Sequence, residues 1–176
     1  HSYYDYDNTA FTHLAVARLA SRGRMNIHVI LPPTRQNYSQ DMLRGLEEYA
    51  PRYGMKFRVA KNVDSDRSSD EIRHWIKQRL AQSPEIDAIL CSSSKGAIAA
   101  LAAIEEHGLR LGEDIDLYSK EVIPILKMFR KNILIEIEDV AEAGRFMAHA
   151  AMRQLLEPDK PPMQHLQIPI EHSGEQ

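Results

Sequence analysis

Apolar positions along the chain alternate between two spacings, one typical of buried strands and one typical of amphipathic helices. Residues 26–31 are apolar at nearly every position and end at Pro32, which predicts a parallel strand covered on both faces. Residues 86–91 have the same character. Between such runs, apolar side chains recur every three or four positions, which predicts helices at about 9–20, 40–49, 70–82 and 95–107.

The same pattern continues through the second half of the chain. Strands are expected at 56–60, 112–118, 133–137 and 165–170, and one more helix at 140–156. Strands that alternate with helices at this spacing form right-handed crossover units. The sequence therefore predicts an α/β fold with a doubly wound parallel sheet.

Composition narrows the class of protein. The chain has 176 residues, 43 % of them hydrophobic, and a net charge of −3, without the basic surplus of a free-standing nucleic-acid binder. Cys91 is the only cysteine, so no disulfide framework is possible and a reducing cytoplasm is expected. The chain starts at His1 rather than Met and shows neither a signal peptide nor a membrane-spanning stretch. We expect it to be part of a longer cytoplasmic protein.

Candidate ligand-binding loops follow from the predicted topology. In open α/β sheets, ligands bind beyond the carboxyl ends of the strands. The loops expected there are 32–40, 62–69 and 92–95, and all three are rich in hydroxyl, amide and carboxylate groups. Such groups suit a ligand with many hydroxyls and no strong charge.

Signals for catalysis are weak. The dinucleotide fingerprint, the phosphate-binding loop and a glycine-flanked nucleophilic serine are absent from the sequence. Ser93 or Ser94 could act as a nucleophile, but a helix N-cap explains both more simply. The eight histidines lack the spacing of a metal site, so neither a metal nor a cofactor is expected. Among aromatic residues, Tyr3, Tyr4 and Tyr6 are candidates for stacking on a sugar.

Five motifs, in order over nearly the whole chain, resemble those of the LacI/GalR regulators. None is specific alone, and the resemblance rests on their order and spacing. They are Asp7-Asn8 with a helix ending near Gly23, Pro32-Pro33 with Arg44-Gly45-Leu46, the segment 87–94 with the helix to Gly108, the turn 112–115, and residues 135–139 with Gly144.

This resemblance implies the effector-binding part of a periplasmic-binding-protein-like type I domain, with one subdomain and part of a second. It assigns residues 1–132 to most of the C-terminal subdomain, the strand and helix at 133–157 to the N-terminal subdomain, and 158–176 to a return to the C-terminal subdomain and a tail. A strand at 133–137 would then lack its neighbours. The resemblance also implies a homodimer that reaches operator DNA only through an N-terminal head upstream of this chain.

By the same resemblance, the effector pocket includes one loop, the serine turn and one acidic residue. The family's effector-binding Arg, its Asn-Asp pair and its pocket Asp fall on different residue types here, which favours a neutral sugar over an anionic effector. The residues implied are Gln36, Asn37, Tyr38, Gln40, Met42, Ser93, Ser94 and Glu121.

Two other functions stay open at this point. One is a sugar-binding protein of the same fold used for transport or chemotaxis, which a secretion signal upstream would favour. The other is a small α/β enzyme, which would require a nucleophile with a base or a metal site.

Overall fold

The computed structural model describes residues 1–121 and 125–169. Its main sheet consists of five parallel strands in the order β3-β2-β4-β5-β6, which confirms the predicted parallel α/β arrangement. The strands are β2 (Asn26–Ile30), β3 (Lys56–Val59), β4 (Ala88–Cys91), β5 (Asp116–Glu121) and β6 (Leu134–Ile137).

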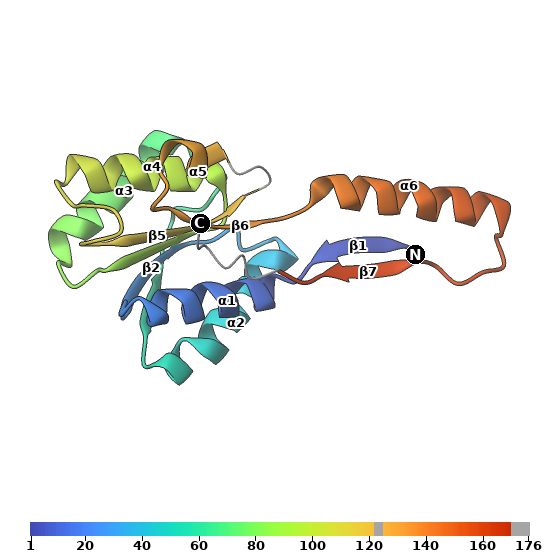
Figure 1. The fold of residues 1–176 in the computed structure, drawn as a ribbon, viewed down its shortest axis with the longest axis horizontal. Coiled ribbons are helices and arrows are strands. Elements are labelled where there is room, and N and C mark those ends of the chain that lie inside the picture. Colours follow the sequence, from blue (N-terminus) through green and yellow to red (C-terminus); the bar gives the residue numbers. More distant parts are fainter. Residues whose placement is uncertain (122–124, 170–176) are drawn as a thin grey trace.

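Helices cover both faces of this sheet. On one face lie α1 (Asn8–Ser21) and α2 (Asn37–Tyr49), and on the other lie α3 (Ser69–Gln82) and α4 (Ser94–Glu106) (Figure 1). Side chains alternate along each strand, so Leu90 joins the core under α1 and α2, whereas Ile89 joins the core under α3 and α4. Because each face of β4 is buried in a hydrophobic cluster, the strand is apolar at every position.

Helix starts follow the polar residues that precede them. The Asp7 carboxylate accepts a hydrogen bond from the Ala10 backbone N–H (2.8 Å) and caps α1. Ser68 and Glu71 form a reciprocal capping box at the start of α3. Three short elements were not predicted: the strand β1 (Tyr3–Tyr6), the 3-10 helix η1 (Pro51–Tyr53) and the helix α5 (Ile125–Phe129).

A second, smaller unit extends from one end of the main sheet (Figure 1). It consists of β1 (Tyr3–Tyr6), β7 (Gln164–Gln167) and α6 (Val140–Leu156), and we call it the arm. The two strands pair in parallel, with Tyr4 opposite His165. The Tyr4 ring packs on the rings of His165 (centroids 4.9 Å apart) and Phe146 (5.5 Å), which joins the strand pair to α6.

Two segments pair differently from the arrangement expected from the sequence. The strand predicted at 133–137 was grouped with the following helix, but β6 lies beside β5 with Tyr118 opposite Leu134. Ile133 is buried in the core under α3 and α4, which explains why this segment stays with the main sheet. Conversely, β1 and β7 belong to the arm rather than to the larger unit, because each supplies the other's only pairing within the described residues.

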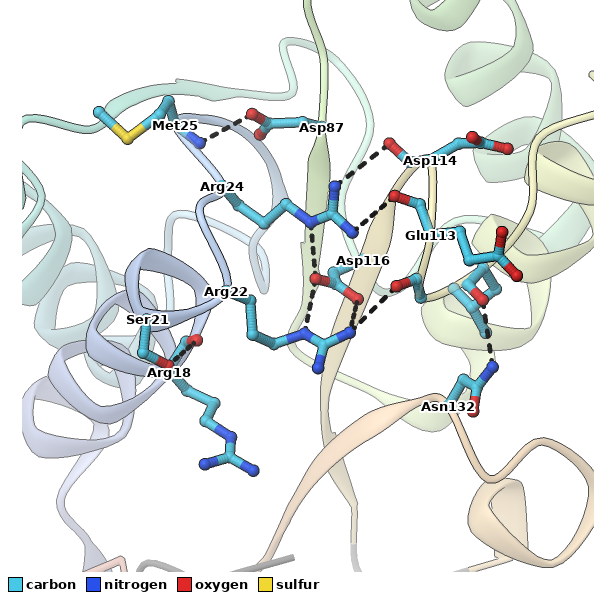
Figure 2. Close-up of polar contacts among 12 residues, drawn as sticks. Arg18, Ser21, Arg22, Arg24, Met25, Asp87, Glu113, Asp114, Asp116 and Asn132 are labelled. Atoms are coloured by element: carbon cyan, nitrogen blue, oxygen red, sulfur yellow. Dashed lines mark hydrogen bonds and ion pairs between the residues drawn. The ribbon is translucent and has the colours of Figure 1, made fainter.

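A charged cluster joins the amino ends of the strands, opposite the end that leads to the arm (Figure 2). Asp116 begins β5, is fully buried, and accepts hydrogen bonds from Arg22 Nε (2.8 Å), Arg22 Nη2 (3.0 Å) and Arg24 Nε (2.7 Å). Burial by itself would raise the pKa of Asp116, but the two guanidinium groups outweigh it and lower that pKa. Asp87 accepts two backbone N–H bonds beside this cluster. The cluster fixes the α1–β2 turn against the start of β5.

Candidate functional site

A pocket of about 510 Å³ opens at the carboxyl ends of the main strands, next to the arm. This is the place at which open α/β sheets bind ligands. Two of the three loops expected from the sequence contribute to it, whereas loop 62–69 does not. The lining residues are Asp5, Tyr6, Asn8, Tyr38, Ser92, Ser93, Ser94, Lys120, Glu121 and Glu138.

The inner wall of the pocket carries a buried carboxylate. Glu121 ends β5 and is only 1 % exposed. It accepts hydrogen bonds from the hydroxyls of Ser94 (2.5 Å) and Ser119 (2.7 Å). A carboxylate has about four acceptor positions, so Glu121 can still accept hydrogen bonds from a ligand.

The serine turn between β4 and α4 contributes three hydroxyls with different roles. Ser93 caps α4 by accepting a hydrogen bond from the Gly96 N–H (3.2 Å), as its N-cap interpretation predicted. Ser94 instead donates to Glu121. The Ser92 hydroxyl is buried and has no hydrogen-bond partner among the described residues. A buried polar group of this kind is satisfied when a ligand or a water binds.

Lys120 stands at the mouth of the pocket, where β5 meets the segments that lead to the arm. Its ammonium donates to Asn8 Oδ1 (3.0 Å) and forms an ion pair with Glu138 Oε2 (2.7 Å). The ammonium also lies 4.5 Å from the ring centroid of Tyr6 and 5.9 Å from that of Tyr38. These contacts hold the buried ring of Tyr6 and the exposed ring of Tyr38 beside the ammonium.

Tyr6 brings a further donor to the site. Burial, followed by the nearby Glu136 carboxylate, raises the pKa of Tyr6, so its hydroxyl stays protonated at neutral pH. This hydroxyl is buried and has no hydrogen-bond partner among residues 1–121 and 125–169. It can therefore donate to a ligand or a water.

Half of the site residues expected from the sequence line the pocket: Tyr38, Ser93, Ser94 and Glu121. The prediction for Met42 needs correction, because its side chain is 0 % exposed and packs in the core under α1 and α2. Position 42 faces inward from α2 and does not line this pocket.

The remaining expected residues surround the start of α2 without lining the pocket. Gln36 is the N-cap residue of α2, and Asn37 begins that helix with an exposed side chain. Gln40 donates to the Thr34 carbonyl (3.2 Å), which directs its amide back to its own loop. The pocket meets this part of the chain only at Tyr38.

Sequence reasoning missed the residues contributed by the connections to the arm. Asp5 and Glu138 were not considered as ligand contacts, and Asn8 was interpreted only as part of a helix cap. Lys120 carried one usable signal, namely a cation at the end of an otherwise buried strand. Such a side chain needs partners, and these come from segments distant in sequence.

The described part of the chain contains no cluster of three or more residues suited to hold a metal ion. Among the described helices, none has both the length and the apolar content required to span a bilayer.

Comparison with known proteins adds a family and a fold. A family model described as a periplasmic binding protein-like domain matches residues 16–172. The HTH-type transcriptional regulator AglR of Rhizobium meliloti (strain 1021) is 32 % identical over 125 residues, which cover 70 % of this chain and 35 % of that regulator. The chain thus spans well under half the length of this relative.

Solved structures share the fold at lower identity. A complex of the transcriptional regulator CelR with cellobiose has a TM-score of 0.82 at 21 % identity, over 96 % of this chain and 52 % of that one. A LacI family transcriptional regulator from Enterococcus faecium with bound ribose has a TM-score of 0.83 at 15 % identity, over 96 % and 62 %.

Proposed function

Because this chain belongs to the family of periplasmic binding protein-like domains, of the LacI type, we propose that it is the effector-sensing part of a bacterial transcription regulator. In this proposal the pocket beside the arm binds a neutral sugar. The regulator acts in the cytoplasm as a homodimer and contacts operator DNA through a head that lies outside the chain.

The observation that carries the proposal is the buried carboxylate of Glu121 in a wall of hydroxyl groups. Vicinal hydroxyls of a sugar can donate to such a carboxylate while accepting from neighbouring hydroxyls, including those of Ser92 and Tyr6. The ring of Tyr38 is partly exposed at the rim, where it offers an apolar face to a pyranose.

Charge in the pocket favours a neutral ligand. Three carboxylates line it, those of Asp5, Glu121 and Glu138, against the single ammonium of Lys120. That ammonium is already paired with Glu138. A phosphorylated or acidic sugar would therefore meet net negative charge, whereas hydroxyls would not. The cellobiose and ribose bound by the two regulators of similar fold support the same class of ligand.

We propose that the sugar is bound and released unchanged. The Ser94 hydroxyl donates to Glu121 rather than to an imidazole, and Glu121 is engaged by Ser119 as well. A carboxylate is a weaker base than an imidazole, and no imidazole accepts this hydroxyl among the described residues, so the pair lacks the usual arrangement that activates a serine nucleophile. Hydrolytic turnover that disappears in the Ser94→Ala variant would favour an enzyme instead.

In the full regulator, a sugar that binds one orientation of the two subdomains better than another shifts their equilibrium. Such a shift changes the spacing of two DNA-reading heads across a dimer axis. The position of the pocket supports this mechanism, because residues of both the main sheet and the arm line it.

The proposal is tested by thermal unfolding with cellobiose, ribose and glucose 6-phosphate. A sugar present at about 100 times its Kd stabilises the folded state by about 2.7 kcal/mol, which raises Tm by roughly 5–10 °C for a chain of this size. We expect this shift with a neutral sugar, and its loss in Glu121→Gln. Glu113→Gln, at the opposite end of the sheet, is the matched control and should keep the shift. A larger shift with the phosphorylated sugar than with any neutral one would contradict the proposal.

A further inference from the structure

The arm is joined to the main sheet by short connections that pass beside the pocket (Figure 1). One connection runs from Tyr6 at the end of β1 to Asn8 at the start of α1, and another runs from β6 through Glu138 to α6. The position of the arm relative to the sheet therefore depends on the backbone at these two places.

Lys120 contacts both connections at once. Its ammonium donates to Asn8 Oδ1 (3.0 Å), pairs with Glu138 Oε2 (2.7 Å) and lies over the Tyr6 ring (4.5 Å to the centroid). The Lys120 side chain is 14 % exposed and that of Glu138 is 28 % exposed, so the pair is only partly screened by solvent. Lys120 itself belongs to β5, in the main sheet.

We propose that Lys120 couples occupancy of the pocket to the position of the arm. The inference rests on the proposed function, because it requires a ligand in this pocket. It goes further by assigning to one residue the transmission of binding from the main sheet to the arm.

The donor capacity of the ammonium gives the direction of the coupling. An ammonium has three N–H donors, and those of Lys120 have two oxygen acceptors among the described residues, Asn8 Oδ1 and Glu138 Oε2. Because Lys120 lines the pocket, a ligand oxygen can accept the third hydrogen bond without displacing either partner. A bound sugar then fixes the ammonium, and with it both connections, so ligand binding stabilises the arm against the sheet.

Linkage makes the coupling reciprocal. If the ligand strengthens the contacts that hold the arm, then loss of those contacts must weaken ligand binding by the same factor. Substitution of Lys120 should therefore change both the mobility of the arm and the affinity for sugar, although Lys120 is far from α6 in the sequence.

Amide hydrogen exchange of the 176-residue chain tests the coupling. Lys120→Met keeps the length of the side chain but removes the three donors, and exchange in α6 and β7 should become roughly tenfold faster, as for loss of a hydrogen bond to a charged group. Lys120→Arg should largely restore slow exchange. Lys131→Met, an exposed position away from the pocket, is the control and should match the unsubstituted chain.

Amides of β4 in the same experiment report global stability. If Lys120→Met also accelerates exchange in β4, the milder Glu138→Gln variant, which removes the charge from the other side of the contact, provides the comparison. In either variant, the coupling is supported if the substitution increases the exchange rate in the arm by a larger factor than the rate in β4. An arm that exchanges no faster than in the unsubstituted chain overturns it.

The same exchange measurement is then made with saturating cellobiose. Protection of α6 and β7 by cellobiose should be present in the unsubstituted chain and absent in Lys120→Met. Equal protection in both would overturn the coupling, even if the sugar binds. Failure of every neutral sugar to bind would count against the proposed function, whereas the unliganded comparison decides the role of Lys120 separately.

Discussion

Neutralising Asp116, the first residue of β5, should destabilise the fold more than neutralising an exposed carboxylate in the turn that precedes this strand. Asp116 is fully buried and accepts three charge-assisted hydrogen bonds from Arg22 and Arg24 (Figure 2). Hydrogen bonds to charged groups contribute about 1.5–3 kcal/mol each. Asp116→Asn keeps one acceptor oxygen and loses the charge, so the expected loss is about 3 kcal/mol.

This loss is large relative to the whole molecule. Domains are stable by roughly 5–15 kcal/mol, and a chain of this size changes Tm by about 2–4 °C per kcal/mol. Asp116→Asn should therefore lower Tm by about 6–12 °C. Urea unfolding monitored by circular dichroism gives the free energy of unfolding, and its slope against urea concentration (the m-value) should be unchanged if the fold is preserved.

The control lies two residues away, in the turn that precedes β5. Asp114 pairs with Arg110, but their side chains are 34 % and 67 % exposed, so Asp114→Asn should cost less than about 1 kcal/mol. Equal losses for the two variants would refute the reasoning that burial makes the Asp116 cluster important.

The pH dependence gives a second check on the same group. The pKa of Asp116 is lowered in the folded state, so its contribution is present above the unfolded pKa, about 3.9, and is lost as the pH falls through the folded value. The difference between the unsubstituted chain and Asp116→Asn should be constant near neutrality and shrink only below about pH 4. A difference that disappears between pH 5 and 7 would contradict this assignment.

Three further predictions concern the core and its helices. Gly45→Ala should destabilise the fold, because the new methyl would meet the Thr12 hydroxyl where α1 and α2 touch. Gly144→Ala, at an open position of α6, should instead stabilise the fold by about 0.5–1 kcal/mol. Thermal unfolding of both variants checks the contrast, and equal effects would contradict it. Burial lowers the pKa of His28 to about 4. The unsubstituted chain should therefore lose stability relative to His28→Gln as the pH falls from about 6.5 to about 4. Urea unfolding at several pH values tests this, and a constant difference in the free energy of unfolding would refute it. Met42→Ala should cost about 2–5 kcal/mol while leaving the affinity for sugar unchanged, as measured by calorimetry; weaker binding by the folded variant would return Met42 to the pocket.

Much of the main sheet could be predicted because its signals are local. The strand expected at 26–31 is observed at Asn26–Ile30, and the helix expected at 95–107 is observed at Ser94–Glu106. A strand buried on both faces has to be apolar throughout, and a helix start is favoured by a capping side chain such as that of Asp7 or Ser93. These requirements act within a few residues, so the sequence displays them.

The candidate site divides in the same way. Ser93 and Ser94 were identifiable because the carboxyl ends of parallel strands meet at one edge of the sheet, whereas Glu121 was indicated only by the resemblance to the LacI/GalR regulators. Met42 was misassigned because its position in the chain does not reveal which way α2 faces, and only packing against α1 shows that it is buried.

What only the tertiary structure decided is the arm and its connection to the pocket. The pairing of β1 with β7 joins segments at opposite ends of the chain, and neither segment carries a strong apolar alternation of its own. Lys120, Asn8 and Glu138 likewise meet only because β5 ends where the chain passes to and from the arm. Local sequence determines which segments become strands and helices, whereas contacts between distant segments depend on how the whole chain packs, and no short stretch of residues contains that information.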